Sequence, residues 1–168
     1  MRRCDSQSMG SAINTMHRLE LKIPPVVLVL LIAVAMWGVS LATMNIALPI
    51  YVRVFAAITF VAAGAGISVA GVIAFKRAKT TVNPTKPDST SALVRENIYG
   101  FTRNPMYLGF LLALVGWAVF LSNAVALLGA VFFVLYMNRF QIVPEERVLT
   151  AMFGAEFVEY KAKVRRWL

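Results

Sequence analysis

The chain has few of the side chains that commonly bind metals or form covalent cross-links. Its 168 residues contain one cysteine, Cys4, and one histidine, His17. No disulfide can therefore close within the chain, and no metal site can be built from several Cys and His ligands. Cys4 is expected to be a free thiol. Acidic residues are also scarce, with 8 Asp and Glu against 17 Lys and Arg, so a pair of adjacent carboxylates stands out.

Charge is absent from two long stretches of the chain. Arg53 is the only charged residue between Ile23 and Phe75, and none lies between Asn104 and Met137. Hydrophobic residues make up 59% of the chain. Uncharged apolar runs of roughly 18 or more residues are typical of membrane-spanning helices. These runs predict an all-α integral membrane protein whose partner is the lipid bilayer, and they argue against a soluble domain.

The apolar stretches predict about four transmembrane helices. The first two are expected at residues 24–44 and 49–75, and the last two form a C-terminal hairpin with a turn at residues 121–123 and an end near Ile142. The predicted organisation is a polar tail (1–22), two membrane helices (23–75) and a core (76–168) that contains a connector, the hairpin and the C-terminal helices.

Smaller signals refine this prediction. Ala62, Gly66 and Ala70 recur every four residues and predict a stripe for close helix packing. Pro144 is expected to begin a separate amphipathic helix, which Gly154 interrupts. Trp167, beside two arginines in the tail, is typical of an anchor at the membrane interface.

The distribution of positive charge predicts the orientation. Lys and Arg gather before the first span, in the connector at 76–103 and after the last span, whereas the two opposite loops hold only Arg53. This pattern predicts a multi-pass protein with both termini in the cytoplasm, and we expect the bacterial inner membrane. Because the pattern accounts for the net charge of +9, nucleic-acid binding is not expected.

The most informative residues flank the third span. Asn104 is expected to be a helix N-cap and Pro105 the first helical residue, so Arg103 lies just ahead of the positive end of a helix dipole. This is a favourable site for an anion. A hairpin would return the chain near this site and bring with it Glu145 and Glu146. An anion site and a cation site would then meet, as a zwitterionic, positively charged cofactor such as S-adenosyl-L-methionine requires.

The same residues resemble the isoprenylcysteine carboxyl methyltransferase family and its phospholipid methyltransferase relatives. That family has an R-H-P-x-Y motif, a hydrophobic hairpin and then an E-E pair. Here the motif is RNPMY at 103–107, followed by Glu145-Glu146. The segments TTVNP at 80–84 and FGAEFVEYKAKVRRW at 153–167 are also similar to the family, and the resemblance covers about residues 76–168. Asn104 replaces the His of many members, and the pattern is that of a short prokaryotic-type member.

The resemblance implies a methyltransferase that uses S-adenosyl-L-methionine and acts on a lipophilic or lipidated acceptor, such as a prenylcysteine-like carboxylate or a thiol. It implies that Arg103 binds a carboxylate of cofactor or substrate, and that Glu145 and Glu146 bind the cofactor's amino group or ribose. The implied catalytic residues are Arg103 and Tyr107, and the implied cofactor-binding residues are Asn104, Pro105, Met106, Tyr107, Glu145 and Glu146.

Other interpretations stay open from the sequence. A phospholipid N-methyltransferase would need a base to take a proton from an amine. A membrane reductase with a similar C-terminal half would be expected to have more spans. A small non-enzymatic membrane scaffold would use Arg103 for lipid phosphate and the two glutamates to complement a helix dipole. The acceptor, the oligomeric state and the ranking of Glu145 against Glu146 are not determined by the sequence.

Overall fold

The computed structural model describes residues 20–78 and 93–168, and within these ranges every regular element is a helix. Cys4, His17, the TTVNP segment at 80–84, most of the predicted polar tail and much of the predicted connector lie outside the described residues. The helices are α2 (Pro25–Ala42), α3 (Ile50–Arg77), η2 (Asn97–Gly100), α4 (Pro105–Leu121), α5 (Leu128–Tyr136), η3 (Met137–Ile142), α6 (Val143–Phe153) and α7 (Ala155–Lys163).

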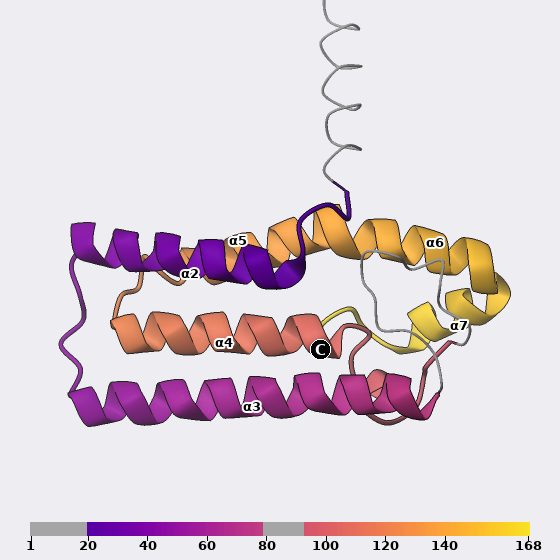
Figure 1. Cartoon of the computed structure of the whole chain (residues 1–168), viewed down its shortest axis with the longest axis horizontal. Coiled ribbons are helices and arrows are strands. Elements are labelled where there is room, and N and C mark those ends of the chain that lie inside the picture. The colour runs from indigo at the N-terminus through magenta and orange to yellow at the C-terminus, as the bar shows by residue number, and fades with distance from the viewer. Residues whose placement is uncertain (1–19, 79–92) are drawn as a thin grey trace, which may run out of the picture.

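Helix α4 lies at the centre of the structure. In Figure 1 it runs between α3 on one side and the α2–α5 pair on the other, and α6 and α7 extend beyond its N-terminal end. The core between α2, α4 and α5 is apolar, and its deeply buried side chains include Leu114, Phe133 and Met137. The start of α4 therefore lies next to the C-terminal helices.

Helices α2 and α3 are long and apolar enough to cross a membrane, with 18 and 28 residues. Many of their large apolar side chains are exposed, including Leu30, Val34 and Phe55. An exposed apolar surface of this extent is typical of helices in contact with lipid. Helix α4 is also apolar but has only 17 residues. The structure thus supports the predicted all-α membrane protein, while the four spans and the sidedness of the termini stay predictions.

The contact between α3 and α4 depends on glycines. A Cβ atom on Gly64 would lie 2.5 Å from the carbonyl oxygen of Gly109, and one on Gly71 would lie 3.0 Å from Pro105 Cγ. The predicted packing stripe is wrong, because a Cβ atom on Gly66 would meet nothing within 4 Å. The chain offers more than one row of small residues on α3, and periodicity alone does not show which row meets α4.

The hairpin turn occurs where the sequence predicts it. Ser122 ends α4 in the left-handed region, at φ 52°. The buried Asn123 fixes the turn, since its amide donates to Thr43 Oγ1 at 2.7 Å and its carbonyl oxygen accepts from the Ala126 N–H at 2.8 Å.

The prediction of a separate helix at Pro144 is wrong. Helices α5 and α6 are continuous through η3, a π-helical segment. Proline lacks an N–H, and its ring clashes with the carbonyl of the preceding turn of an ordinary α-helix. The wider π turn just ahead of Pro144 gives the ring space, so the helix continues. The predicted break at Gly154 is confirmed by its positive φ of 52°.

Candidate functional site

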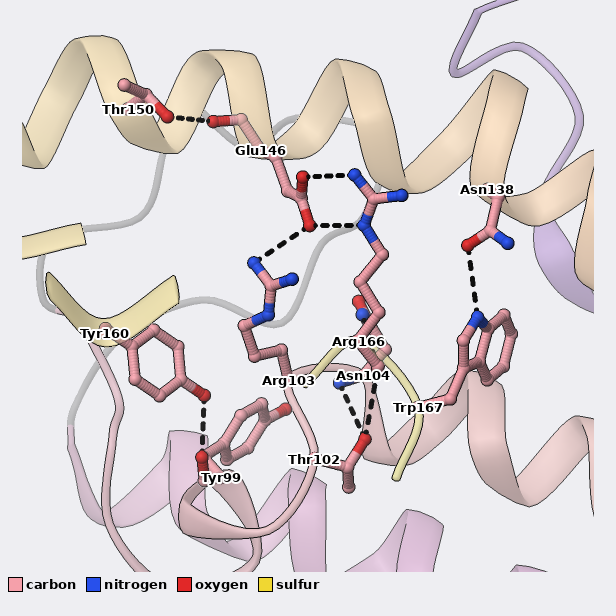
Figure 2. A network of polar contacts seen from close by, with 10 residues as sticks. All are labelled: Tyr99, Thr102, Arg103, Asn104, Asn138, Glu146, Thr150, Tyr160, Arg166 and Trp167. Carbon is pink, nitrogen blue, oxygen red and sulfur yellow. Dashed lines mark hydrogen bonds and ion pairs between the residues drawn. The ribbon is translucent and has the colours of Figure 1, made fainter. Parts of the chain in front are cut away.

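Arg103 and Glu146 meet at the junction of α4 and α6. Arg103 precedes the first turn of α4, and its Nη1 lies 2.9 Å from Glu146 Oε1 in the first turn of α6 (Figure 2). Both side chains are largely buried, with 11% and 12% exposure. The hairpin therefore brings the predicted anion and cation sites together, and in the structure they pair with each other.

Glu146 also binds a second guanidinium, which the sequence did not single out. Arg166 Nε donates to Oε1 at 2.9 Å, and Nη2 donates to Oε2 at 2.8 Å. Figure 2 shows the two arginines approaching the same carboxylate from two segments of the chain. Such bidentate pairs are among the stronger and more directional hydrogen bonds in proteins. The sequence offered two signals for Arg166, which are its place in the family-like segment at 153–167 and its contribution to the positive charge after the last span, and neither indicates that it meets Glu146.

Arg166 is carried by residues 164–168, which we call the strap. The strap runs back along the start of α4 and hydrogen bonds to it. The Arg103 N–H donates to the carbonyl of Arg165 at 3.1 Å. The carbonyl of Arg166 accepts from Thr102 Oγ1 at 3.2 Å and from Asn104 Nδ2 at 3.0 Å. Three residues before α4 thus fix the position of Arg166.

Asn104 occupies the N-cap position of α4, as predicted, but its side chain makes no capping hydrogen bond. Its amide binds the strap instead. Trp167 is also part of this attachment. Its Nε1 donates to Asn138 Oδ1 at 3.1 Å and its ring packs against Phe133, whereas its role as an anchor at the membrane interface stays a prediction.

Tyr107 and Glu145 form a second contact in the same region. The Tyr107 hydroxyl donates to Glu145 Oε1 at 2.6 Å, and Gln141 Nε2 donates to the same oxygen at 2.8 Å. Tyr107 and Gln141 are buried. Gln141 lies in the π-helical segment and was not predicted, because nothing in its sequence neighbourhood shows that it faces Glu145.

The environment of Glu145 makes its carboxyl group a weak acid. Burial raises its pKa to about 7, the hydrogen bonds from Tyr107 and Gln141 oppose this rise, and the charge of Glu146 adds to it. A carboxyl group with this pKa can take up or release a proton near neutral pH.

Arg103 has unused hydrogen-bonding capacity. Its Nε and Nη1 are buried and have no hydrogen-bond partner among the described residues, since the approach of Nη1 to Glu146 is an ion pair without hydrogen-bond geometry. Burial lowers the pKa of the guanidinium, and the charge of Glu146 opposes this effect. Buried donors without acceptors are costly, so their presence indicates a place for a ligand.

Pro105 and Met106 do not join these contacts through their side chains. Pro105 is buried against α3, where its ring faces Gly71, and the Met106 side chain also lies near Gly71. The Met106 carbonyl accepts from Ser68 Oγ at 3.5 Å. The structure therefore joins Arg103 to Glu146 and Tyr107 to Glu145, and it places Pro105 and Met106 on the side of α3.

Comparison with known proteins identifies the family. A sequence model described as phospholipid methyltransferase matches residues 52–156. The chain belongs to the phospholipid methyltransferase family. The match spans most of α3, the start of α4, the hairpin and the Glu145-Glu146 pair. The resemblance predicted from the sequence is thus confirmed.

Two relatives named for an activity are similar to this chain over part of their length. A protein-S-isoprenylcysteine O-methyltransferase of Saccharomyces cerevisiae is 36% identical over 80 residues, which is 48% of this chain and 34% of the relative. Protein-S-isoprenylcysteine O-methyltransferase B of Arabidopsis thaliana is 31% identical over 110 residues, which is 64% of this chain and 54% of the relative. This phospholipid methyltransferase family member therefore spans about a third to a half of these two relatives.

A shorter relative matches more strongly. An uncharacterized protein of Haemophilus influenzae is 51% identical over 63 residues, which is 38% of this chain and the whole of the relative. No solved structure matches the chain.

Proposed function

We propose that the protein is a membrane-embedded methyltransferase that uses S-adenosyl-L-methionine and methylates a lipophilic acceptor through a carboxylate or thiol. Family membership supports methyl transfer. The observation that carries the proposal is the buried Arg103–Glu146 pair, in which Arg103 retains unpaired donors. The exposed apolar surfaces of α2 and α3 support acceptors that partition into a bilayer.

The side chains at the site fit the proposed methyl donor. Its amino-acid portion is a zwitterion, so it needs an anion for the ammonium group and a hydrogen-bonding cation for the carboxylate. Glu146 offers the first and Arg103 the second. Glu145 can accept hydrogen bonds from an ammonium or ribose hydroxyls, while Tyr107 holds its carboxyl group in place.

The donor supplies a methyl group activated by a positively charged sulfur. The residues of this chain then have three tasks, which are to bind the donor, to orient the acceptor and to exclude water. A carboxylate or thiolate acceptor would form its bond to the methyl carbon as the sulfur–methyl bond breaks and the donor leaves as a neutral thioether, and it would have no proton to give up. Positioning alone can therefore account for the reaction, and Asn104 supports it by holding the strap beside the site.

A second candidate, N-methylation of an amine-bearing lipid, is favoured by one observation. An ammonium acceptor must lose a proton before its nitrogen can attack, so the site would need a base. Glu145 is a buried carboxyl group with a pKa of about 7. Its carboxylate could take the proton, after which the nitrogen–methyl bond forms as the sulfur–methyl bond breaks.

Two measurements on purified protein test the proposal. Calorimetry in detergent should detect binding of S-adenosyl-L-methionine, and Glu146→Gln should weaken that binding at least tenfold, because it removes the charge that faces the ammonium group. No binding to the wild-type protein would overturn the proposal.

Transfer of labelled methyl groups from S-adenosyl-L-methionine to a panel of acceptors identifies which chemical group is methylated. We expect incorporation into a prenylcysteine-like carboxylate or a lipophilic thiol, with Glu145→Gln retaining part of that activity. Incorporation into an amine lipid that Glu145→Gln abolishes would instead establish the second candidate.

A further inference from the structure

The strap delivers Arg166 to a carboxylate that Arg103 already approaches. Glu146 receives an ion pair from Arg103 at 2.9 Å and two hydrogen bonds from Arg166 at 2.9 and 2.8 Å. Nothing in the family comparison assigns Arg166 a role. Arg166 and Arg103 nevertheless share the carboxylate of Glu146.

The charges around Glu146 are unbalanced. Two guanidinium groups face one carboxylate, and the nearby Glu145 has a pKa of about 7, so it is only partly ionised at neutral pH. Burial of a positive charge is unfavourable unless an anion compensates it, and this applies to the largely buried Arg103, which shares its carboxylate with Arg166. A zwitterion that enters the cluster offers one new partner for each sign of charge, so its ammonium can face Glu146 while its carboxylate faces the arginines.

Arg166 differs from Arg103 in its freedom to move. The Arg103 side chain is 11% exposed, whereas that of Arg166 is 37% exposed. The backbone of the strap is nevertheless fixed, because the carbonyls of Arg165 and Arg166 accept hydrogen bonds from residues 102–104. The Arg166 guanidinium can thus change partner by rotation of its side chain while the strap stays in place.

We propose that Arg166 is a second ligand of the methyl donor's carboxylate, and that the Arg166–Glu146 pair separates when the donor's ammonium group binds Glu146. This inference rests on the proposed function of the site. It adds to that function a specific residue from outside the RNPMY motif and the glutamate pair. It also assigns the strap a direct part in donor recognition.

The test compares two ligands that differ only in the carboxylate. Calorimetry with detergent-purified protein measures the affinities of S-adenosyl-L-methionine and of its decarboxylated form, which keeps the ammonium and sulfonium groups. We expect Arg166→Ala to weaken binding of the complete donor roughly 10- to 100-fold, as for loss of a charged bidentate contact. Binding of the decarboxylated form should be unchanged or tighter, because Glu146 is then free of its Arg166 partner.

Two further variants make the result specific. Arg165→Ala changes the neighbouring arginine, whose side chain is exposed, and it should leave both affinities unchanged. Arg166→Gln keeps much of the side chain and should show the same selective loss if Arg166→Ala does not fold. An equal loss of affinity for both ligands would reduce Arg166 to a structural role and overturn the inference, as would no loss for either. Failure of the wild-type protein to bind either ligand would instead reject the proposed function itself.

Discussion

Tyr107 and Glu145, 38 residues apart in the chain, are joined by a 2.6 Å hydrogen bond in which the phenol donates to the carboxylate. The contact links the first turn of α4 to the first turn of α6. The hydrogen bond therefore holds the Glu145 carboxyl group in place between the two ends of the hairpin. It also favours the ionised form of Glu145, which burial disfavours.

Removal of this hydrogen bond should shift the pH dependence of donor binding. The hydrogen bond from the phenol lowers the pKa of Glu145, so Tyr107→Phe should raise that pKa and move the midpoint of the pH profile upward. Calorimetry across pH 6–9 measures the midpoint. Tyr136→Phe, a change of the same kind on α5, is the control. Superimposable profiles for the wild type and Tyr107→Phe would show that ionisation of Glu145 does not govern binding.

Glu145 should also make the protein less stable as the pH rises. Its folded pKa of about 7 lies above the ordinary value of 4.5, so the native state binds more protons than the unfolded state between these values. Stability is then greatest below the ordinary pKa and falls until the pH passes 7, by roughly 3 kcal/mol at most. Thermal unfolding in detergent should show a flatter pH dependence in Glu145→Gln. The exposed Glu159→Gln should retain the wild-type slope.

Arg103→Lys should lose much of the methyltransferase activity, and Arg103→Ala nearly all of it. Lysine keeps the charge but lacks the planar fork that can grip a carboxylate with two hydrogen bonds. Loss of such a contact in a buried site costs roughly 2–5 kcal/mol, or a factor of about 30 to several thousand in rate. Incorporation of labelled methyl groups measures the effect. Full activity in the lysine variant would reject the role of the fork, and full activity in the alanine variant would remove Arg103 from the site.

The α3–α4 contact gives a matched pair of substitutions. Gly64→Ala should destabilise the protein by roughly 1–3 kcal/mol, because the new methyl group would meet the Gly109 carbonyl at 2.5 Å. Gly66→Ala, on the open side of the same helix, should be neutral or stabilising, since alanine favours helix more than glycine does. Thermal unfolding in detergent compares the two variants, and equal effects would show that α4 does not pack against Gly64 in solution.

The sequence predicted the parts of this fold that depend on local patterns. Long uncharged runs marked α2 and α3, Pro105 marked the start of α4, and Leu121-Ser122-Asn123 marked the turn. The motif and the glutamate pair also indicated that Arg103 would lie near Glu146, because the second arm of a helical hairpin ends close to the beginning of the first arm. The sequence could not show which small residues face α4, since both rows on α3 are compatible with a helical period.

The features missed by sequence analysis depend on contacts between distant segments. The strap binds residues 102–104 mainly through backbone carbonyls, and backbone groups are the same in every sequence. Gln141 reaches Glu145 within a π-helical segment, whose geometry differs from the period used to assign faces. Nor does the sequence indicate that Glu146 is buried, whereas its side chain is only 12% exposed and pairs with two arginines.

The π-helical segment at Met137–Ile142 sets the rotation of everything that follows it. Successive residues of an α-helix are turned by about 100° around its axis, so one residue more or fewer in a turn redirects all later side chains. The wide turn therefore sets the rotation between the exposed apolar side chains of α5 and the site residues of α6. Deletion of a single residue there would leave a long helix, but it would turn Glu145 and Glu146 away from Tyr107 and Arg103. The angular position of the acidic pair is thus determined by the length of this segment as much as by the two glutamates themselves.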